Sequence, residues 1–477
     1  MMRRIWFILT ALLAVGAVAA RGASESEPQV GSASAGSTPT VVVSAARDGA
    51  ASHVGAPTPS GVRCRRKLNP GANVERALSS ASPGAVVCLN AGVWPAITLS
   101  SIAHASPGVT LAATPGQTVV VAGFTVTGSR TRNLTIEGFE ITVPGNVSNS
   151  QGGNPSNGIQ LLCGISGRLK LEHNTIEDQP NGDGIYAFAN NCSPHAGSTQ
   201  SGVTVEYNQI DHVATALEID GGMAEEHNFV ISRNVIGPSI QDGGYGHYIQ
   251  VQGISGLTID NNAFEGPPDP SYERCAADGS HLNVLHVDTG GQRDVTFDNN
   301  IIWHSQSCGD TVLIQDSPTD NITIRNNLDV EDPTCETSGC DANPVLVQAP
   351  HGLEFQHNTF VNATRGIALG GTSGTTYTDP HSMTAEYNIA TPVITGDRNY
   401  SLWNCSSSCT TQDNVSADWS AKTVLRGTGN VVRWMPSWTS TSWMPVSGPG
   451  YEPPPPGYYR PTGLALKGAG YEGRIGP

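Results

Sequence analysis

Short runs in which apolar and polar residues alternate recur along most of the chain. In the phrase GLTIDNNAFEG (residues 256–266), Leu257 and Ile259 would face one side of an extended strand while Thr258 and Asp260 face the other. Related phrases are RLKLEHNTIED, GVTVEYNQIDH, DVTFDNNIIWH and GLEFQHNTFVN. This period of two predicts short β-strands rather than helices.

An asparagine keeps its place in each phrase, and a second apolar alternation precedes it. The aligned asparagines are Asn174, Asn208, Asn234, Asn262, Asn300, Asn327, Asn358 and Asn388. They lie 26 to 38 residues apart, a period typical of solenoids and propellers. Propeller blades need four antiparallel strands and roughly 40 or more residues, and these units lack tight hairpin signals. We therefore predict an all-β, parallel β-solenoid with three short strands per coil.

The repeated asparagine has two properties that suit a stacked turn. Its backbone tolerates the left-handed conformation that a tight bend requires. When identical residues lie above and below it, its amide can both donate and accept hydrogen bonds along the stack. We predict that the aligned asparagines adopt the left-handed conformation and pair with each other inside the solenoid.

Both ends of a solenoid need protection from edge pairing. The segment NVERALSSA, residues 73–81, predicts a short helix that begins at Asn73 and lies over the first coil as an N-terminal helical cap. Residues 396–477 are rich in Trp and Pro and predict an irregular C-terminal capping tail. An aromatic patch that binds carbohydrate is the alternative for this tail. The β-helix itself is expected over residues 62–395.

The chain begins with the features of a secretory signal. Arg3 and Arg4 precede an apolar run over residues 5–19, and Ala17-Val18-Ala19 resembles a cleavage site. The run is shorter than the roughly 20 residues of a membrane span. We predict a signal peptide over residues 1–20, a flexible Ser-, Ala-, Gly- and Pro-rich linker over residues 21–61, and a secreted, extracellular protein.

Cysteine usage and charge narrow the possible partners. The chain has 10 cysteines, an even number that suits disulfide bonds in an oxidising compartment. We predict the pairs of sequence neighbours Cys64/Cys88, Cys163/Cys192, Cys275/Cys308, Cys335/Cys340 and Cys405/Cys409. Zinc binding is the alternative, but no Cys-x-x-Cys pair is present. A net charge of −16 argues against nucleic acid or an anionic membrane as the partner.

The segment SPGAVVCLNAGVW from Ser82, the repeated strands and the asparagine stack resemble the pectate-lyase-like right-handed parallel β-helix superfamily over about residues 62–395. That superfamily contains lyases, hydrolases, epimerases and adhesins, so the resemblance implies the fold more than the reaction. It also implies a site on the outer face of the first strand of each coil. In its lyases, Ca²⁺ acidifies the proton beside a uronate carboxylate, and Arg or Lys removes that proton.

Polar side chains concentrate on the outward positions of the middle first strands. The candidate catalytic residues are Tyr186, Glu218, Asp220, His286 and Asp288. The candidate substrate-binding residues are Asp183, Tyr248, Gln250, Gln252, Arg274, Arg293 and Gln315. Long connections over residues 237–247, 265–281, 303–310 and 329–343 are expected to flank these strands as the walls of a groove.

Two kinds of chemistry fit this arrangement. Adjacent coils lie about 4.8 Å apart, so Glu218 and Asp220 should lie roughly 9 to 10 Å from His286 and Asp288. Facing carboxylates at about 6.5–9.5 Å suit an inverting glycosidase. Alternatively, Asp220 and Asp288 could hold Ca²⁺, which takes oxygen ligands and could bridge to a uronate.

We therefore predict a secreted lyase or glycosidase that acts on an extracellular, uronic-acid-containing or other polysaccharide. The expected partner is this glycan, without nucleic acid or a membrane span, and the protein is expected to be a monomer. The sequence lacks a complete polygalacturonase motif set and the pectate-lyase Trp-x-Asp-His motif. A non-catalytic glycan-binding protein and a structural spacer are thus the alternatives.

Overall fold

The structure is a computed structural model that describes most of the chain from residue 62 onward. All described residues belong to one compact unit, Ser52–Pro477. The described residues are 62–128, 130–142, 157–162, 164–177, 182–188, 201–221, 226–237, 247–265, 283–288, 291–305, 310–315, 319–331, 345–348, 350–363, 367–369, 381–392, 403–405, 409–416, 430–432, 437–438 and 461–462. The predicted signal peptide and linker lie outside these residues.

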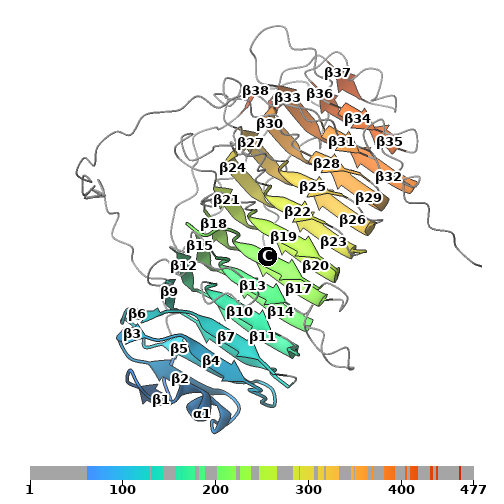
Figure 1. The fold of residues 1–477 in the computed structure, drawn as a ribbon. Helices are drawn as coiled ribbons and strands as arrows, with labels where there is room; N and C mark the ends of the chain where they lie inside the picture. The colour runs from blue at the N-terminus through green and yellow to red at the C-terminus, as the bar shows by residue number, and fades with distance from the viewer. Residues whose placement is uncertain are drawn as a thin grey trace, which may run out of the picture. The chain divides into compact units, whose positions relative to one another are not determined.

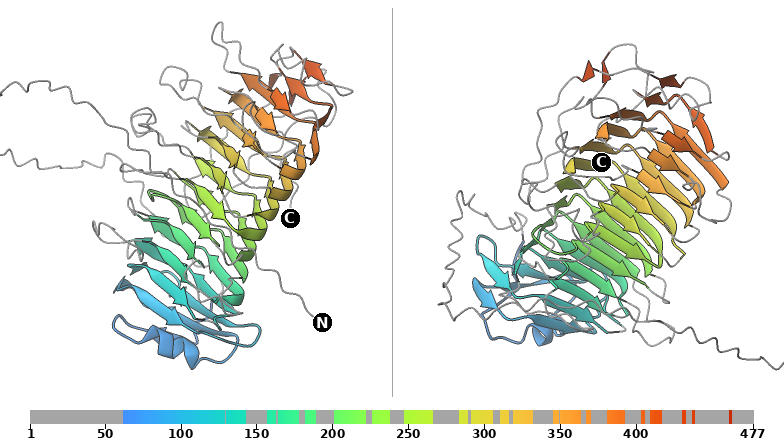
Figure 2. Two further views of the ribbon diagram at one scale, coloured as in Figure 1. Left: turned by 45° about the vertical axis from the view of Figure 1, so that its right-hand side comes forward. Right: turned by 45° about the horizontal axis from the view of Figure 1, so that its top comes forward.

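Within the described residues, strands from successive coils form three long parallel sheets (Figures 1 and 2). Sheet one contains β4 (Ile97–Ser100), β7 (Phe124–Thr127), β10 (Ile159–Leu162), β13 (Ile185–Phe188), β16 (Leu217–Asp220), β19 (Ile249–Gln252), β22 (Leu285–Val287), β25 (Val312–Ile314), β28 (Val345–Val347), β31 (Ile367–Leu369) and β34 (Trp403–Cys405). Its strands pair in parallel, in the order in which the chain produces them.

The other two sheets follow the same order. Sheet two contains β1 (Arg66–Leu68), β2 (Ala85–Leu89), β5 (Val109–Ala113), β8 (Leu134–Glu137), β11 (Ser166–Glu172), β14 (Ser201–Glu206), β17 (Glu226–Ser232), β20 (Ile254–Asp260), β23 (Arg293–Asp298), β26 (Thr319–Arg325), β29 (Pro350–Gln356), β32 (His381–Glu386) and β35 (Cys409–Gln412). Sheet three contains β3 (Gly92–Trp94), β6 (Val119–Val121), β9 (Glu140–Thr142), β12 (Thr175–Glu177), β15 (Gln209–Ile210), β18 (Val235–Ile236), β21 (Ala263–Glu265), β24 (Ile301–Ser305), β27 (Leu328–Glu331), β30 (Thr359–Ala363), β33 (Ile389–Pro392), β36 (Val415–Ser416) and β37 (Val431–Val432). The predicted solenoid with three strands per coil is confirmed.

Alternation along each strand explains why the chain folds this way. In β16, Leu217 and Ile219 are buried while Glu218 and Asp220 are partly exposed. Equivalent aliphatic residues of adjacent coils lie in register, so they stack inside the coil and form one continuous hydrophobic core. The outward polar residues are brought into register by the same pairing, and this pairing builds the site described below.

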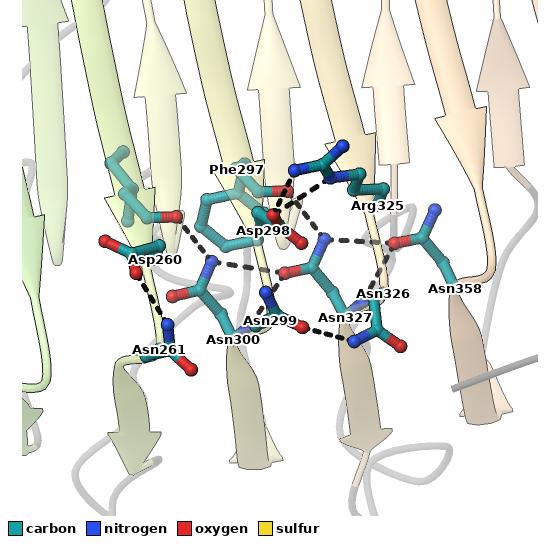
Figure 3. Close-up of polar contacts among 11 residues, drawn as sticks. Asp260, Asn261, Phe297, Asp298, Asn299, Asn300, Arg325, Asn326, Asn327 and Asn358 are labelled. Atoms are coloured by element: carbon teal, nitrogen blue, oxygen red, sulfur yellow. Dashed lines mark hydrogen bonds and ion pairs between the residues drawn. The ribbon is translucent and has the colours of Figure 1, made fainter. Parts of the chain in front are cut away.

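The aligned asparagines form a buried hydrogen-bonded ladder between sheets two and three (Figure 3). The Nδ2 of Asn300 donates to Oδ1 of Asn327 at 3.1 Å and to the carbonyl oxygen of Ile259 at 2.9 Å. The backbone N–H of Asn300 donates to the same Oδ1 of Asn327 at 3.0 Å. This pattern repeats from Asn174 to Asn414. The predicted self-pairing is confirmed, because each buried amide finds both donors and acceptors.

The backbone conformation of the ladder differs from the prediction. The residue before each ladder asparagine, not the asparagine itself, has positive φ, as in Asn261 (φ 58°) and Asn299 (φ 54°). Positions of this kind also include His173, Tyr207 and Arg233. The ladder asparagine must point its amide inward, so the sharp change of direction falls on the outward residue before it. The assignment of the left-handed conformation to the ladder asparagines was therefore wrong.

The N-terminal segment is held against the first coils. The helix α1 (Val74–Ser79) begins after Asn73, whose Oδ1 accepts from the N–H of Arg76 at 2.8 Å. Its residues Val74 and Leu78 join the hydrophobic core. The predicted disulfide Cys64–Cys88 is present, with 5.5 Å between the two Cα atoms.

At the other end, parallel pairing continues past the expected boundary at residue 395. The strands β35, β36 and β37 add to sheets two and three, and the ladder extends to Asn414 and Asn430. A short antiparallel pair, β38 (Ser437–Trp438) and β39 (Pro461–Thr462), follows. The boundary was predicted at residue 395 because the last asparagine aligned in the sequence is Asn388. The later coils keep the asparagine without the rest of the repeated phrase.

Several predicted features fall on residues that the structure does not describe. These are the four flanking connections for most of their length, Arg274, and the cysteines Cys163, Cys192, Cys275, Cys308, Cys335 and Cys340. The side chain of Cys405 is likewise outside the description, while Cys409 is disulfide-bonded. No cysteine side chain in the described part of the chain is free.

Candidate functional site

The outward residues of sheet one form a row across four consecutive coils. The pairing of β13, β16, β19 and β22 places Tyr186, Glu218, Gln250 and His286 in direct register (Figure 1). The sequence predicted that side chains at equivalent positions in successive coils become neighbours. This prediction is confirmed for these four residues. We call this row the first row.

A second row lies two residues further along the same strands. It contains Phe188, Asp220 and Gln252, which are in register on β13, β16 and β19. Asp288 directly follows β22, and its N–H donates to the carbonyl of Val251 at 3.0 Å, so it continues this row. The two rows together are called the stripe, and the stripe brings aromatic, carboxyl, amide and imidazole groups together.

Two carboxyl groups of the stripe region share a hydrogen bond. Asp183 precedes β13, and its carboxyl group is hydrogen-bonded to Glu218 in the next coil and to Thr215. Burial raises the pKa of Asp183 well above its usual range, and the charge of Glu218 raises it further. Asp183 therefore keeps its proton when Glu218 ionises, and it then donates to the Glu218 carboxylate.

Glu218 is poised to titrate near neutrality. Burial, and then the negative charge of Asp220, raise its pKa to about 7, while the hydrogen bond from Asp183 partly offsets them. A carboxyl group with this pKa is an effective proton donor at neutral pH. The pair therefore has the electrostatics of a general acid, and Asp220 is the neighbouring carboxylate on the same face of β16.

Tyr186 and Phe188 border this acidic group. Their rings stack with 5.3 Å between centroids and an interplanar angle of 16°. Burial, followed by the charges of Glu218, Asp220 and Asp183, raises the pKa of the Tyr186 phenol. Tyr186 thus keeps its proton through the neutral range, and it can donate a hydrogen bond but cannot act as a base.

A hydrogen-bonded series of imidazole and amide groups extends from one to three coils beyond Glu218. The N–H of Asn283 lies 3.2 Å from Nδ1 of His247, whose Nε2 lies 3.0 Å from Nδ1 of His286. The Nε2 of His286 lies 3.0 Å from Nε2 of the Gln315 side-chain amide. His247, His286 and Asn283 are buried.

The backbone N–H at the start of this series favours one set of tautomers. Because Asn283 donates to Nδ1 of His247, the proton of a neutral His247 is on Nε2, and it is donated to Nδ1 of His286. The proton of His286 is then on Nε2. The structure places Nε2 of Gln315 3.0 Å from that nitrogen, so this tautomer requires the Gln315 amide to turn over and accept through its Oε1. Both nitrogens of His286 are hydrogen-bonded, and its role as a catalytic base stays a prediction. Within this hydrogen-bonded series, His286 orients the side chain of Gln315.

His247 belongs to a set of pre-strand residues of which the sequence analysis assigned only Asp183 to the site. Each stands two positions before the first strand of its coil; the set is Asn157, Asp183, Thr215, His247, Asn283 and Asp310. These residues are mostly buried, and neighbours bond to one another, as when the N–H of Asp183 donates to Asn157 at 2.9 Å. A polar residue at a fixed offset before each strand was the available signal.

Other candidates lie away from the stripe. Tyr248 is only 3% exposed, packs edge-on against Phe264, and donates its hydroxyl to the carbonyl of Glu265 at 2.7 Å. It precedes β19, where the strand alternation does not yet apply, so its ring turns into the core. Arg293 begins β23 in sheet two, and its Nε donates to the hydroxyl of Ser255. Neither placement suits the predicted contact with substrate.

The placement of Asp220 and Asp288 bears on the predicted Ca²⁺ site. Gln252 stands between Asp220 and Asp288 in the second row, so the two predicted ligands are two coils apart. In the described part of the chain, no three His, Cys, Asp or Glu side chains gather into a metal-binding group. The described residues alone do not supply the six to eight oxygen ligands that Ca²⁺ takes, and the Ca²⁺ site stays a prediction.

Comparison with known proteins bears on the fold. The family described as "Right handed beta helix region" matches residues 196–379, which confirms the right-handed parallel β-helix and the predicted resemblance at the level of the fold. No curated protein matches the chain. Among the described residues, no helix combines the length and apolar character of a membrane crossing.

The chain is similar to several solved structures at low identity. The family 6 alginate lyase AlyGC is 14% identical, with a TM-score of 0.47 over 85% of this chain and 56% of its own, so the match spans just over half of that lyase. A mannuronic-acid-specific family 6 lyase from human gut microbiota is 15% identical, with a TM-score of 0.42 over 78% of this chain and 91% of its own. Pectate lyase Pel9A is 13% identical, with a TM-score of 0.36 over 86% of this chain and 92% of its own.

Proposed function

We propose that this protein is a secreted glycoside hydrolase that cleaves an extracellular polysaccharide at the stripe of sheet one. The observation that carries the proposal is the carboxyl pair of Asp183 and Glu218 beside Asp220. Glu218 has a pKa of about 7, so it holds a transferable proton under neutral conditions. Asp220 supplies its negative charge from the same face of the same strand.

The spacing of these carboxyl groups suits hydrolysis with inversion. Glu218 and Asp220 are two residues apart on a strand, so their side chains emerge about 6.6 Å apart at roughly 3.3 Å per residue. Inverting glycosidases use carboxyl groups about 6.5–9.5 Å apart, which leaves room for a water molecule. We assign Glu218 as the general acid and Asp220 as the general base.

The reaction then needs three coupled changes. Glu218 transfers its proton to the glycosidic oxygen as the bond from that oxygen to the anomeric carbon breaks. A water oxygen forms the new bond to the anomeric carbon, and the water proton passes to Asp220. As Glu218 loses its proton and becomes negative, Asp183 donates a hydrogen bond to it and stabilises the Glu218 carboxylate.

The remaining polar groups of the stripe are suited to binding sugar hydroxyls. Gln250 and Gln252 lie in the coil beside Glu218 and Asp220. The side-chain amide nitrogen of Gln315 lies 3.0 Å from Nε2 of His286, and this contact holds the amide beside the first row. The stacked rings of Tyr186 and Phe188 offer apolar surface to sugar C–H groups.

A polysaccharide panel tests the proposal. The purified full chain is incubated with neutral, amino-sugar and uronate polysaccharides, and both new reducing ends and ultraviolet-absorbing unsaturated products are measured. Reducing ends without unsaturated products, lost in Glu218→Gln and Asp220→Asn, are expected. Unsaturated products would replace the hydrolase by a lyase. Tight binding without any product would replace it by a glycan-binding protein.

A further inference from the structure

The charges on sheet one restrict the class of glycan that the proposed site accepts. Four carboxyl groups, those of Asp183, Glu218, Asp220 and Asp288, stand on or beside the stripe. The strands of sheet one contain neither Lys nor Arg. A glycan lying along the stripe therefore meets negative charge and amides without a basic side chain from these strands.

Basic residues of the neighbouring coils are placed and paired elsewhere. Lys170 lies on β11 in sheet two, with its Nζ 2.7 Å from Glu172. Arg325 lies on β26 and binds Asp298 through Nε and Nη2 at 2.9 and 2.8 Å. These side chains are engaged on another face, where they balance the carboxylates of sheet two.

A uronate polymer would place one carboxylate on every sugar next to these groups. Like charges in a partly buried site repel, because the lower effective dielectric strengthens their interaction. A uronate would also oppose the ionisation of Asp220, on which the proposed base depends. Hydroxyl and amide groups, by contrast, can pair with the carboxylates and with Gln250 and Gln252 without a charge penalty.

We propose that the substrate of this site is a glycan without carboxylate groups, built from neutral or amine-bearing sugars. The inference rests on the proposed function, because it assumes that the glycan binds at the stripe. It departs from the uronic-acid-containing substrate considered from the sequence. The reason is that pairing places Arg293, one of the expected cations, on sheet two beside Ser255.

Two pairs of matched polymers test this inference by calorimetry at low salt. Polygalacturonate is compared with its fully methyl-esterified form, and chitosan oligosaccharides are compared with their N-acetylated forms. The ester is expected to bind at least tenfold more tightly than the polyuronate. The amine form is expected to bind at least as tightly as the acetylated form. Raising the salt to about 0.5 M should shrink both differences, because it screens charge.

Variants locate the effect. Asp220→Asn should reduce severalfold the ratio between the Kd for polygalacturonate and the Kd for its methyl ester. Asp320→Asn, which removes an exposed carboxylate on β26 in sheet two that contacts His351, should leave the preference unchanged. Tighter binding of polyuronate than of its ester, or binding of none of the four polymers, would overturn the inference. The expected charge order without any cleavage would uphold the inference and reject the hydrolase.

Discussion

The Nε2 of His247 lies 3.0 Å from the Nδ1 of His286, and both rings are buried between the core and the stripe. The Asn283 N–H, 3.2 Å from Nδ1 of His247, favours donation from Nε2 of His247 to Nδ1 of His286. We therefore predict that imidazole ¹⁵N spectra at pH 7.5 show Nδ1 unprotonated and Nε2 protonated in both histidines. A protonated Nδ1 in His286 would contradict the assigned series.

The hydrogen bonds that link His247, His286 and Gln315 predict a kinetic effect of replacing His247. Replacement by leucine removes the donor to His286, so Gln315 loses its fixed orientation. KM for the cleaved glycan should rise about 5- to 50-fold with a smaller change in kcat, because binding is affected more than proton transfer. Gln315→Leu should reproduce the KM effect. A large loss of kcat at unchanged KM would show that the histidines act in the chemical step.

The pH dependence of cleavage follows from Glu218. Its pKa is raised to about 7, and the acid must be protonated to donate, so kcat/KM should fall tenfold per pH unit above about pH 7. Asp220 contributes to the raised pKa, and Asp220→Asn should lower it. Because that variant loses its base, a ¹³C NMR titration of the Glu218 carboxyl is the appropriate measurement. An unchanged or higher pKa in the variant would contradict the electrostatic account.

A second buried carboxyl group predicts how stability depends on pH. Glu137 on β8 is hydrogen-bonded to Glu172, which also pairs with Lys170; burial, then Glu172, raise its pKa to about 7. Since the folded pKa exceeds the unfolded one, its contribution is complete below about pH 4.5 and is lost as pH rises through about 7.

Glu137→Gln should therefore raise the free energy of unfolding at pH 8.5 by about 1–3 kcal/mol and change it little at pH 4.5. Denaturant titrations at the two pH values measure this. Glu140→Gln, on the adjacent strand β9, provides the control and should show no such difference. Equal effects of Glu137→Gln at both pH values would reject the assignment.

The asparagine ladder predicts a large difference between two neighbouring residues. Asn262→Ala removes the Oδ1 that accepts from the N–H and Nδ2 of Asn234, at 3.0 Å each, and leaves those donors buried. It should cost roughly 2–5 kcal/mol of unfolding free energy. Asn261→Gly, at the adjacent outward position with φ 58°, should change stability by less than about 1 kcal/mol. Similar costs for both would contradict the ladder.

The fold was predictable because its signal repeats. Alternation in β16 and its neighbours indicated which residues face inward, and stacking converted that pattern into rows such as Glu218, Gln250 and His286. Tyr248 was misplaced because a residue just before a strand does not obey the alternation. Arg293 was expected beside the stripe from its chemistry, but a single coil sends residues so near in sequence to different sheets.

The site could be predicted only in part. The carboxylates of β16 stood out in the sequence, but the shared proton between Asp183 and Glu218 depends on a contact between adjacent coils. The role of His286 depends on a backbone N–H at Asn283, which no side-chain pattern reveals. The repeat predicted where these side chains lie. Their protonation states depend on hydrogen bonds between coils, which only the three-dimensional structure shows.

The anomeric configuration of the first product tests the account most directly. Once the panel has identified a cleaved glycan, ¹H NMR during the first minutes of the reaction reports which anomer is released. An acid and a base whose positions on β16 are about 6.6 Å apart predict inversion. A retained configuration would contradict the roles of Glu218 and Asp220, as would an inverted product that Asp220→Asn still forms at the wild-type rate.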